Sequence, residues 1–233
     1  MKIIEITPRS IEQLDDMAEE MACAYKYDFA KEPWNEVSRC INTACRVGFS
    51  ACATGTPCLE CNEAMVEAYD TTELITNWRK LVQDEDGFME IAVDGKNSFL
   101  RTTIARPTTP EELSARKYGD DEGVRQWLDQ SLPRSFVWIE DTFANLRQSP
   151  NGNMVGRGKT LARIALRYCG NDIVTRTKVE AIVCATTRDA GPATDMWLGT
   201  NGAGKRFAGE VRSIGSVPDA RTVLRVDGKQ VLR

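Results

Sequence analysis

The stretch SFVWIEDTFANL at residues 135–146 is followed, after a short connection, by GRGKTLA at residues 156–162. Aromatic and β-branched residues dominate the first stretch, which is typical of a β-strand. A Pro-Asn-Gly-Asn turn begins at Pro150, and residues 160–168 then have the apolar spacing of a helix. KVEAIVCATT at residues 178–187 predicts another strand. These segments therefore predict a strand, a helix and a second strand in succession.

The rest of the chain adds helices and strands on both sides. Asp94-Gly95 between two apolar runs is a strong hairpin signal. In chain order the other predicted elements are a strand at 3–6, a helix at 11–25, hairpin strands at 88–93 and 98–105, a polar helical stretch at 111–130, a short helix near 192–198, and strands at 206–214 and 221–226. This order predicts one mixed α/β (α+β) domain over residues 1–233. A cysteine-rich segment, residues 36–66, is inserted between the first helix and the first hairpin.

Composition excludes several classes of protein. The chain has 233 residues, with 34 acidic against 30 basic residues and a formal net charge of −4. We therefore expect no nonspecific binding to nucleic acid. No run approaches the ~18 consecutive apolar residues of a membrane span, and the early acidic residues do not resemble a secretory signal. The expected location is the cytoplasm.

Histidine is absent from the sequence. Catalytic triads with histidine, H-E-x-x-H metalloprotease sites and zinc sites that need an imidazole are therefore excluded. Any general base must be a carboxylate, a thiolate, a tyrosine, a lysine or water.

The glycine-containing turn at 156–162 leads into the predicted helix. Such a turn directs backbone N–H groups toward one point at the positive end of the helix, where a phosphate or pyrophosphate binds well. Arg157 and Lys159 add positive charge. The alternative is a surface loop that happens to carry basic residues.

RGKTLARIAL at 157–166, between two predicted strands, resembles the acetyl-coenzyme A signature of the GCN5-related N-acetyltransferases (GNATs). The opening of the chain is similar to that family's first strand and helix, and the segment from Pro192 to Trp197 is similar to a later family segment. The resemblance covers most of residues 1–35 and 88–230. It implies a GNAT-like twisted mixed sheet flanked by helices, and acetyl-CoA as the acyl donor. Thr160 departs from the family pattern, where a glycine is usual, and Trp197 stands where many members have tyrosine.

The resemblance also implies which residues contact acetyl-CoA. A backbone N–H within residues 143–146 would polarise the thioester oxygen. The implied cofactor-binding residues are Phe143, Asn145, Arg157, Gly158, Lys159, Thr160, Leu161 and Ala162.

The implied reaction is direct attack of an amine on the thioester, which requires a base and an acid. Glu140 and Asp141 are the candidate bases, because in the family this strand borders the acceptor site. Their side chains point to opposite faces of a strand, so only one faces the acceptor; we favour Glu140. The alternative is that both are solvated acids. The acid that protonates the leaving thiolate is Tyr168, Cys184 or water.

Five cysteines lie between residues 40 and 61. Cys45, Cys52, Cys58 and Cys61 are the expected ligands of a tetrahedral zinc site, with the C-x₂-C pair at its centre. The alternatives are cysteines packed as small apolar residues in a buried helix and loop, or cysteines with redox or disulfide roles.

Two functions follow. The first is an acetyl-CoA-dependent N-acetyltransferase whose partners are acetyl-CoA and an amine acceptor; a homodimer is compatible with it. The second is a noncatalytic protein of the same fold, whose cysteine-rich segment binds a macromolecular partner.

Overall fold

A computed structural model describes residues 1–31, 34–45, 47–84, 86–118, 130, 132–145, 157–170, 179–187, 203–214 and 221–232. In chain order its elements are β1 (Lys2–Ile6), the 3-10 helix η1 (Pro8–Ser10), α1 (Ile11–Asp15), α2 (Ala18–Phe29), β2 (Ser38–Cys40), β3 (Phe49–Ser50), β4 (Met65–Glu67), α3 (Thr71–Asp84), β5 (Phe88–Val93), β6 (Phe99–Thr108), α4 (Pro110–Leu113), the π-helix η2 (Ser114–Tyr118), β7 (Phe136–Ala144), α6 (Arg157–Cys169), β8 (Ala181–Thr187), α8 (Ala203–Arg206), β9 (Glu210–Ile214), β10 (Arg221–Asp227) and α9 (Gly228–Val231). No helix in these ranges combines the length and the apolar character that crossing a membrane requires.

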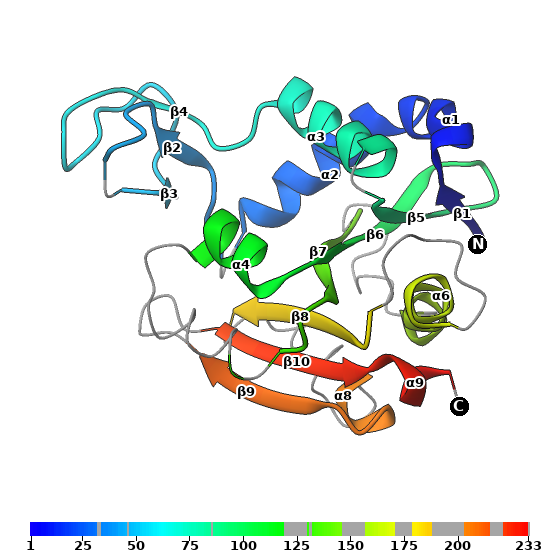
Figure 1. The fold of residues 1–233 in the computed structure, drawn as a ribbon. Coiled ribbons are helices and arrows are strands. Elements are labelled where there is room, and N and C mark those ends of the chain that lie inside the picture. Colours follow the sequence, from blue (N-terminus) through cyan, green and yellow to red (C-terminus); the bar gives the residue numbers. More distant parts are fainter. Residues whose placement is uncertain are drawn as a thin grey trace. The chain divides into compact units, whose positions relative to one another are not determined.

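The main sheet has seven strands in the order β1-β5-β6-β7-β8-β10-β9 (Figure 1). β7 pairs with β8 in parallel, whereas β10 pairs with both β8 and β9 antiparallel. A parallel pair inside a sheet with antiparallel neighbours makes the sheet mixed. The predicted fold class, a mixed α/β domain with a mixed sheet flanked by helices, is confirmed.

The chain forms two compact units, and strands β5, β6 and β7 each contribute residues to both. The first unit comprises residues 1–83, 91–102 and 143–153, and the second comprises residues 84–90, 103–142 and 154–233.

An aromatic cluster forms the core of the first unit. Tyr25 on α2 meets Phe143 and Trp78 in edge-to-face geometry, with ring centroids 5.0 and 6.0 Å apart. Phe143 also stacks on Trp78 at 5.9 Å and lies 5.8 Å from Phe99. Helix α3 supplies Trp78 to this cluster, and Asp70 begins this helix because its Oδ1 accepts from the Glu73 N–H at 2.8 Å.

In the second unit, apolar side chains pack on both faces of the strands. Val137 and Ile139 of β7 lie on one face with helices α6 and α9, and Phe136 and Trp138 lie on the other face with Leu113 of α4. This alternation is the two-residue period of a strand that is buried on both faces. Val183 of β8 and Val223 of β10 extend the second group.

The structure corrects several predicted boundaries. The helix expected at 11–25 is two helices, interrupted at Asp16 and Met17. There the Met17 N–H bonds to the Leu14 carbonyl, three residues earlier, at 3.0 Å. Helix α3 was not predicted, nor was α9. The strand expected from residue 206 begins at Glu210, after the short helix α8.

Two other predicted segments have different outcomes. The helical stretch expected at 111–130 is helical as α4 and η2 up to Tyr118, and residues 119–129 lie outside the described residues. The helix expected near 192–198 also lies outside them. The hairpin is confirmed: Asp94 Oδ1 accepts from the Lys96 and Ser98 N–H groups at 2.7 and 2.9 Å.

Gly228, at the start of α9, lies so close to α6 that it has no room for a side chain. A Cβ at this position would lie 2.3 Å from Cys169 Sγ and 2.6 Å from Cys169 Cβ. We expect Gly228→Ala to lower the free energy of unfolding by about 2 kcal/mol through overpacking. Urea unfolding followed by circular dichroism measures this loss.

Gly95→Ala is the matched control, because nothing lies within 4 Å of a Cβ built there. Its effect should stay within about 0.5 kcal/mol. The Gly228→Ala loss should also shrink in a Cys169→Ala background, since the two side chains would share the same space. An equal loss in both backgrounds would contradict the proposed clash.

Candidate functional site

Strands β7 and β8 separate after three paired residues. The pairs are Phe136 with Ala181, Val137 with Ile182 and Trp138 with Val183. The backbone is described for residues 139–142 of β7 and 184–187 of β8, and the parallel β7–β8 pairing does not include these residues. We call these two diverging stretches the β7–β8 fork. Their facing backbone groups are not used by this pairing, and they lie at the carboxyl ends of two parallel strands, where α/β proteins commonly bind ligands.

Glu140, a predicted base, lies in the fork and forms two ion pairs. Arg106 Nε of β6 donates to Glu140 Oε1 at 2.6 Å, and Arg116 of η2 contacts the same oxygen. The Glu140 side chain is 9% exposed, and the two arginines are 18% and 28% exposed. The Oε1 atom of Glu140 therefore already accepts from two guanidinium groups. The geometry therefore favours a positioning role for Glu140, holding two cations beside the fork.

Thr142 lies two residues further along β7, on the same face of the strand as Glu140. Its Oγ1 is buried and has no hydrogen-bond partner among the described residues. Buried hydroxyl groups are normally hydrogen-bonded, so an unpaired one beside the fork is a candidate contact for a ligand. Asp141, the other predicted base, is half-buried and belongs to the opposite face.

Helix α6 contains most of the predicted cofactor-binding residues. Lys159 is exposed in its first turn, whereas Leu161 is buried and Ala162 packs against the core of the second unit. Gly156 and the side chain of Arg157 lie outside the described part of the chain, and Gly158 is described only as part of the helix backbone. Of the predicted phosphate-binding turn, only Lys159 therefore has a described side chain that is exposed.

Thr160 is turned toward the sheet. Its Oγ1 donates to Glu90 Oε1 at 2.7 Å, and Arg163 Nε donates to Glu90 Oε2 at 2.6 Å. Glu90 is fully buried on β5, and Thr160 is 2% exposed. Thr160 stands where the family that the sequence resembles usually has glycine. In the structure, its hydrogen bond to Glu90 connects α6 to β5. Glu90 and Arg163 were not predicted as interacting residues.

The two predicted side-chain acids lie in the core. The Tyr168 hydroxyl donates to the Asp86 carbonyl at 2.6 Å, and the side chain is fully buried on α6. Burial raises the pKa of Cys184, which is the first β8 residue beyond the β7–β8 pairs and is paired with Leu224 of β10.

Phe143 and Asn145 belong to the first unit. The Phe143 ring is part of the aromatic cluster. The Asn145 backbone N–H donates to the Leu100 carbonyl at 2.8 Å, and its amide donates to Glu20 Oε1 at 3.3 Å. The Ala144 N–H donates to Asp28 Oδ2 at 3.2 Å. Of residues 143–146, where an oxyanion donor was expected, Ala144 and Asn145 therefore already use their N–H groups.

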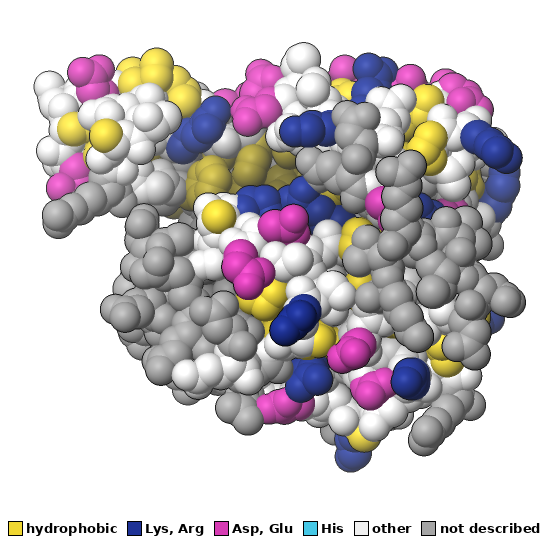
Figure 2. Space-filling model, in the orientation of Figure 1, with side chains coloured by type: hydrophobic (Ala, Val, Ile, Leu, Met, Phe, Trp, Pro, Cys, Tyr) yellow, Lys and Arg dark blue, Asp and Glu magenta, His cyan; other side chains and the backbone are white. Residues whose placement is uncertain are grey.

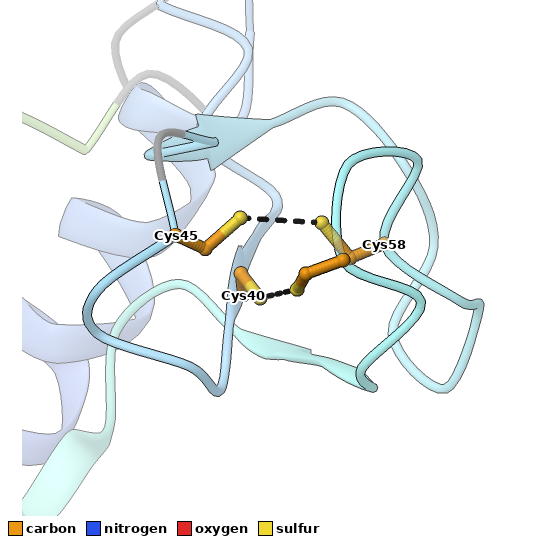
Figure 3. Close-up of side chains that lie close together, drawn as sticks. Cys40, Cys45 and Cys58 are labelled. Atoms are coloured by element: carbon orange, nitrogen blue, oxygen red, sulfur yellow. Dashed lines mark hydrogen bonds between the residues drawn. The ribbon is translucent and has the colours of Figure 1, made fainter.

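Three of the four predicted metal ligands come together with a fourth cysteine. The Sγ atoms of Cys40, Cys45, Cys58 and Cys61 all lie within 4.8 Å of one another. Figure 3 shows the side chains of Cys40, Cys45 and Cys58 close together. Cys40 and Cys61 are 3.4 Å apart, and Cys45 and Cys58 are 3.7 Å apart. Cys52 is not a member of this group; its carbonyl accepts from the Ser38 hydroxyl at 2.8 Å. The predicted set is thus corrected at one position, with Cys40 in place of Cys52.

The pKa values of Cys58 and Cys40 are shifted in opposite directions. Backbone N–H groups of Cys61 and Glu60 point at the Cys58 sulfur and lower its pKa to about 7. Burial raises the pKa of Cys40 to about 12. A cation bound among the sulfurs would favour the thiolate form of each.

The geometry so far describes a mixed α/β protein with a strand fork and a four-cysteine group. No family model matches the sequence, and no curated protein matches it. Solved structures similar over nearly the full length include acetyltransferases, one of them described as a member of the GNAT superfamily, and also a CoA-dependent synthase and a GNAT-like decarboxylase.

Three structures illustrate this similarity. An N-acetyltransferase from Staphylococcus aureus Mu50 is 8% identical, with a TM-score of 0.47, over 98% of this chain and 97% of the other. A GNAT superfamily phosphinothricin acetyltransferase from Sinorhizobium meliloti, in complex with AcCoA, is 8% identical with a TM-score of 0.47, over 97% and 89%. The CoA-dependent acyl-homoserine lactone synthase MesI is 13% identical with a TM-score of 0.47, over 99% and 91%. Such likeness concerns the overall fold alone.

Proposed function

We propose that this protein is an acetyl-CoA-dependent N-acetyltransferase. The observation that carries the proposal is the β7–β8 fork, where two parallel strands stop pairing after Trp138 and Val183. The pantetheine arm of coenzyme A is narrow and contains two amide groups. It can hydrogen-bond to strand edges as an added strand does. The fork offers such edges over residues 139–142 and 184–187.

Helix α6 supports the same placement. It follows β7 and begins at Arg157, near the carboxyl end of that strand in the sequence. The first turn of a helix attracts phosphate because its N–H groups are unpaired and the helix dipole is positive there. In the proposal the pyrophosphate lies at this turn, with Lys159 close to it, and the thioester lies in the fork.

The reaction is transfer of an acetyl group to an amine. The amine nitrogen attacks the thioester carbonyl, a C–N bond forms and the C–S bond breaks. The amine loses one proton to water, and the coenzyme A thiolate takes up one proton from water. Glu140 holds Arg106 and Arg116 beside the fork. In the proposal, the positive charges of these two arginines interact with the charge of the acceptor.

The test is binding of acetyl-CoA, followed by native mass spectrometry and isothermal titration calorimetry. Acetyl-CoA and acetyl-pantetheine should both bind, the second more weakly because it lacks the pyrophosphate; ADP alone should bind least. No adduct with acetyl-CoA, under conditions that preserve a known acetyltransferase complex, would contradict the proposal.

Thr142→Val separates ligand binding from stability. Because Oγ1 has no partner among the described residues, we expect the free energy of unfolding to stay equal or rise by up to about 1 kcal/mol. If the hydroxyl contacts acetyl-CoA, the dissociation constant should rise roughly fivefold, which corresponds to one hydrogen bond.

Thr108→Val is the control for this change. The Thr108 hydroxyl donates to Glu112 Oε2 at 3.2 Å, so its loss should lower stability and leave affinity unchanged. Equal affinities of the Thr142→Val and wild-type proteins would remove Thr142 from the proposed binding site.

A second function is favoured by one observation. The cysteine-rich segment has large apolar side chains at its surface, with Leu59 92% exposed. A noncatalytic protein of this fold could use that surface to bind a macromolecule. It would then bind no acyl-CoA, so the same titration distinguishes the two functions.

A further inference from the structure

The cysteine-rich segment at residues 36–66 has very little apolar core. Its strands β2, β3 and β4 form a separate small sheet in the order β3-β2-β4, with two or three residues each (Figure 1). Its buried cluster contains Cys40, Cys58 and Met65, with Cys45, Val47 and Cys61 packed against them. Four of these six side chains are cysteines.

Three large apolar side chains of the segment are exposed instead. Ile41 is 56% exposed, Phe49 is 49% exposed and Leu59 is 92% exposed. Figure 2 shows hydrophobic side chains on the surface of this part of the molecule. Segments of this size without a core are usually held by disulfides or by a metal.

The four sulfur atoms are not joined by disulfides in the structure, and their arrangement fits a metal. All eight cysteines are free, and the 3.4 and 3.7 Å separations far exceed the ~2.05 Å of a disulfide bond. Zinc–sulfur bonds of ~2.3 Å in a regular tetrahedron place the sulfurs about 3.8 Å apart. The observed distances, and the 4.8 Å upper limit for the whole group, are close to this value.

The backbone around the cysteines also suits bound thiolates. N–H groups two residues downstream point at three of the sulfurs, from Asn42 to Cys40, from Val47 to Cys45 and from Glu60 to Cys58. Donation of this kind stabilises a thiolate and fixes its direction. This repeated turn is a second feature, separate from the sulfur distances, and three of the four cysteines share it.

The C-x₂-C pair lies at the tip of a tight hairpin. The Cys58 N–H donates to the Glu63 carbonyl at 2.7 Å, and the Asn62 N–H donates to the Cys58 carbonyl at 2.9 Å. Asn62 has a φ of 62°, a left-handed conformation that asparagine tolerates better than most residues. The turn thereby brings Cys58 and Cys61 to the same side, facing Cys40 and Cys45.

We propose that Cys40, Cys45, Cys58 and Cys61 bind one Zn²⁺ and that this ion holds the segment folded. Four thiolates in a tetrahedron favour zinc, and they leave no position for a substrate or a catalytic water. The site is therefore structural, and it is independent of acetyl-CoA binding at the fork.

The first test is the metal content of purified wild-type, Cys40→Ser and Cys52→Ser proteins, measured by inductively coupled plasma mass spectrometry. Wild-type and Cys52→Ser should each contain about one zinc per chain. Cys40→Ser should lose zinc affinity by more than the ~10–100-fold that an outer-shell change costs. Cys52 is the matched control because it is in the same segment but outside the group.

The second test does not depend on whether a variant folds. Zinc is removed from the wild-type protein with a thiol reagent and chelator, the thiols are reduced, and zinc or Co²⁺ is added back. Amide hydrogen exchange should rise within residues 36–66 on removal and return on addition of zinc. Thiolate-bound Co²⁺ should show the visible absorption of a tetrahedral site.

Three results would overturn the proposal. One is equal zinc loss in Cys40→Ser and Cys52→Ser. Another is iron, in place of zinc, in protein purified from zinc-supplemented medium. The third is a zinc-free protein with reduced thiols whose segment exchanges no faster than that of the zinc-bound protein. Acetyl-CoA binding can fail without affecting any of these readouts.

Discussion

Phe143→Ala is expected to lower the free energy of unfolding by about 4 kcal/mol, which is the largest loss predicted for a single substitution in this chain. Phe143 is 2% exposed and contacts Tyr25, Trp78 and Phe99 through its ring. Truncation removes these contacts and leaves a cavity that the surrounding rings can fill only in part. Urea unfolding followed by tryptophan fluorescence measures the loss, since Trp78 stacks on this ring.

Phe49→Ala is the control for this substitution. Phe49 also stacks on a tyrosine, Tyr69, at 5.2 Å, but its side chain is 49% exposed. Its removal should cost less than about 1 kcal/mol. If both substitutions cost the same, the aromatic cluster would not be the core of the first unit. The pair also tests the sequence interpretation of Phe143, because a residue needed only for cofactor binding would leave the stability of the free protein unchanged.

Arg163→Met is expected to cost about 3 kcal/mol of stability. Arg163 approaches the fully buried Glu90 with two nitrogens, at 2.6 and 2.5 Å from Oε2. Methionine retains the aliphatic length but not the charge, so the buried carboxylate loses a positive partner. Breaking a buried pair on one side is costly because the remaining charge stays in a poorly solvated place.

Arg79→Met provides the comparison. Arg79 pairs with Asp15 at 2.6 Å, but these side chains are 47% and 39% exposed. The loss should be below about 1 kcal/mol, because water screens exposed pairs. Glu90→Gln in the Arg163→Met background should recover part of the stability. No recovery would show that Arg163 contributes through packing and not through its charge.

Much of the fold was predictable because its signals are local. At Asp94-Gly95 the Asp94 side chain accepts hydrogen bonds from backbone N–H groups two and four residues later, which stabilises the hairpin turn. The turn can therefore be recognised from a few adjacent residues. Helix α3 was missed although Trp78, Leu81 and Val82 have helical spacing and are buried. The break at Asp16 and Met17 has no such signal, because the apolar positions continue across it.

The candidate site was less predictable because its contacts join distant residues. Glu90 meets Arg163 across 73 positions, and Arg106 meets Glu140 across 34. No spacing rule links such pairs. The proposed metal ligands are an intermediate case. Cys40 and Cys45 have a C-x₄-C spacing that suits zinc, but only the fold shows that Cys40, and not Cys52, is the fourth member of the group.

The eight cysteines differ enough in their surroundings to permit selective chemical labelling. Burial raises the pKa of Cys169 to about 11 and that of Cys184 still further, and a protonated thiol is a poor nucleophile. Zinc would shield four more. Cys23 is exposed on α2, and Cys52 is only half-buried. In a Cys52→Ser background, a maleimide dye or spin label should therefore attach at Cys23 alone, which gives a reporter on helix α2 without changes to the buried cysteines.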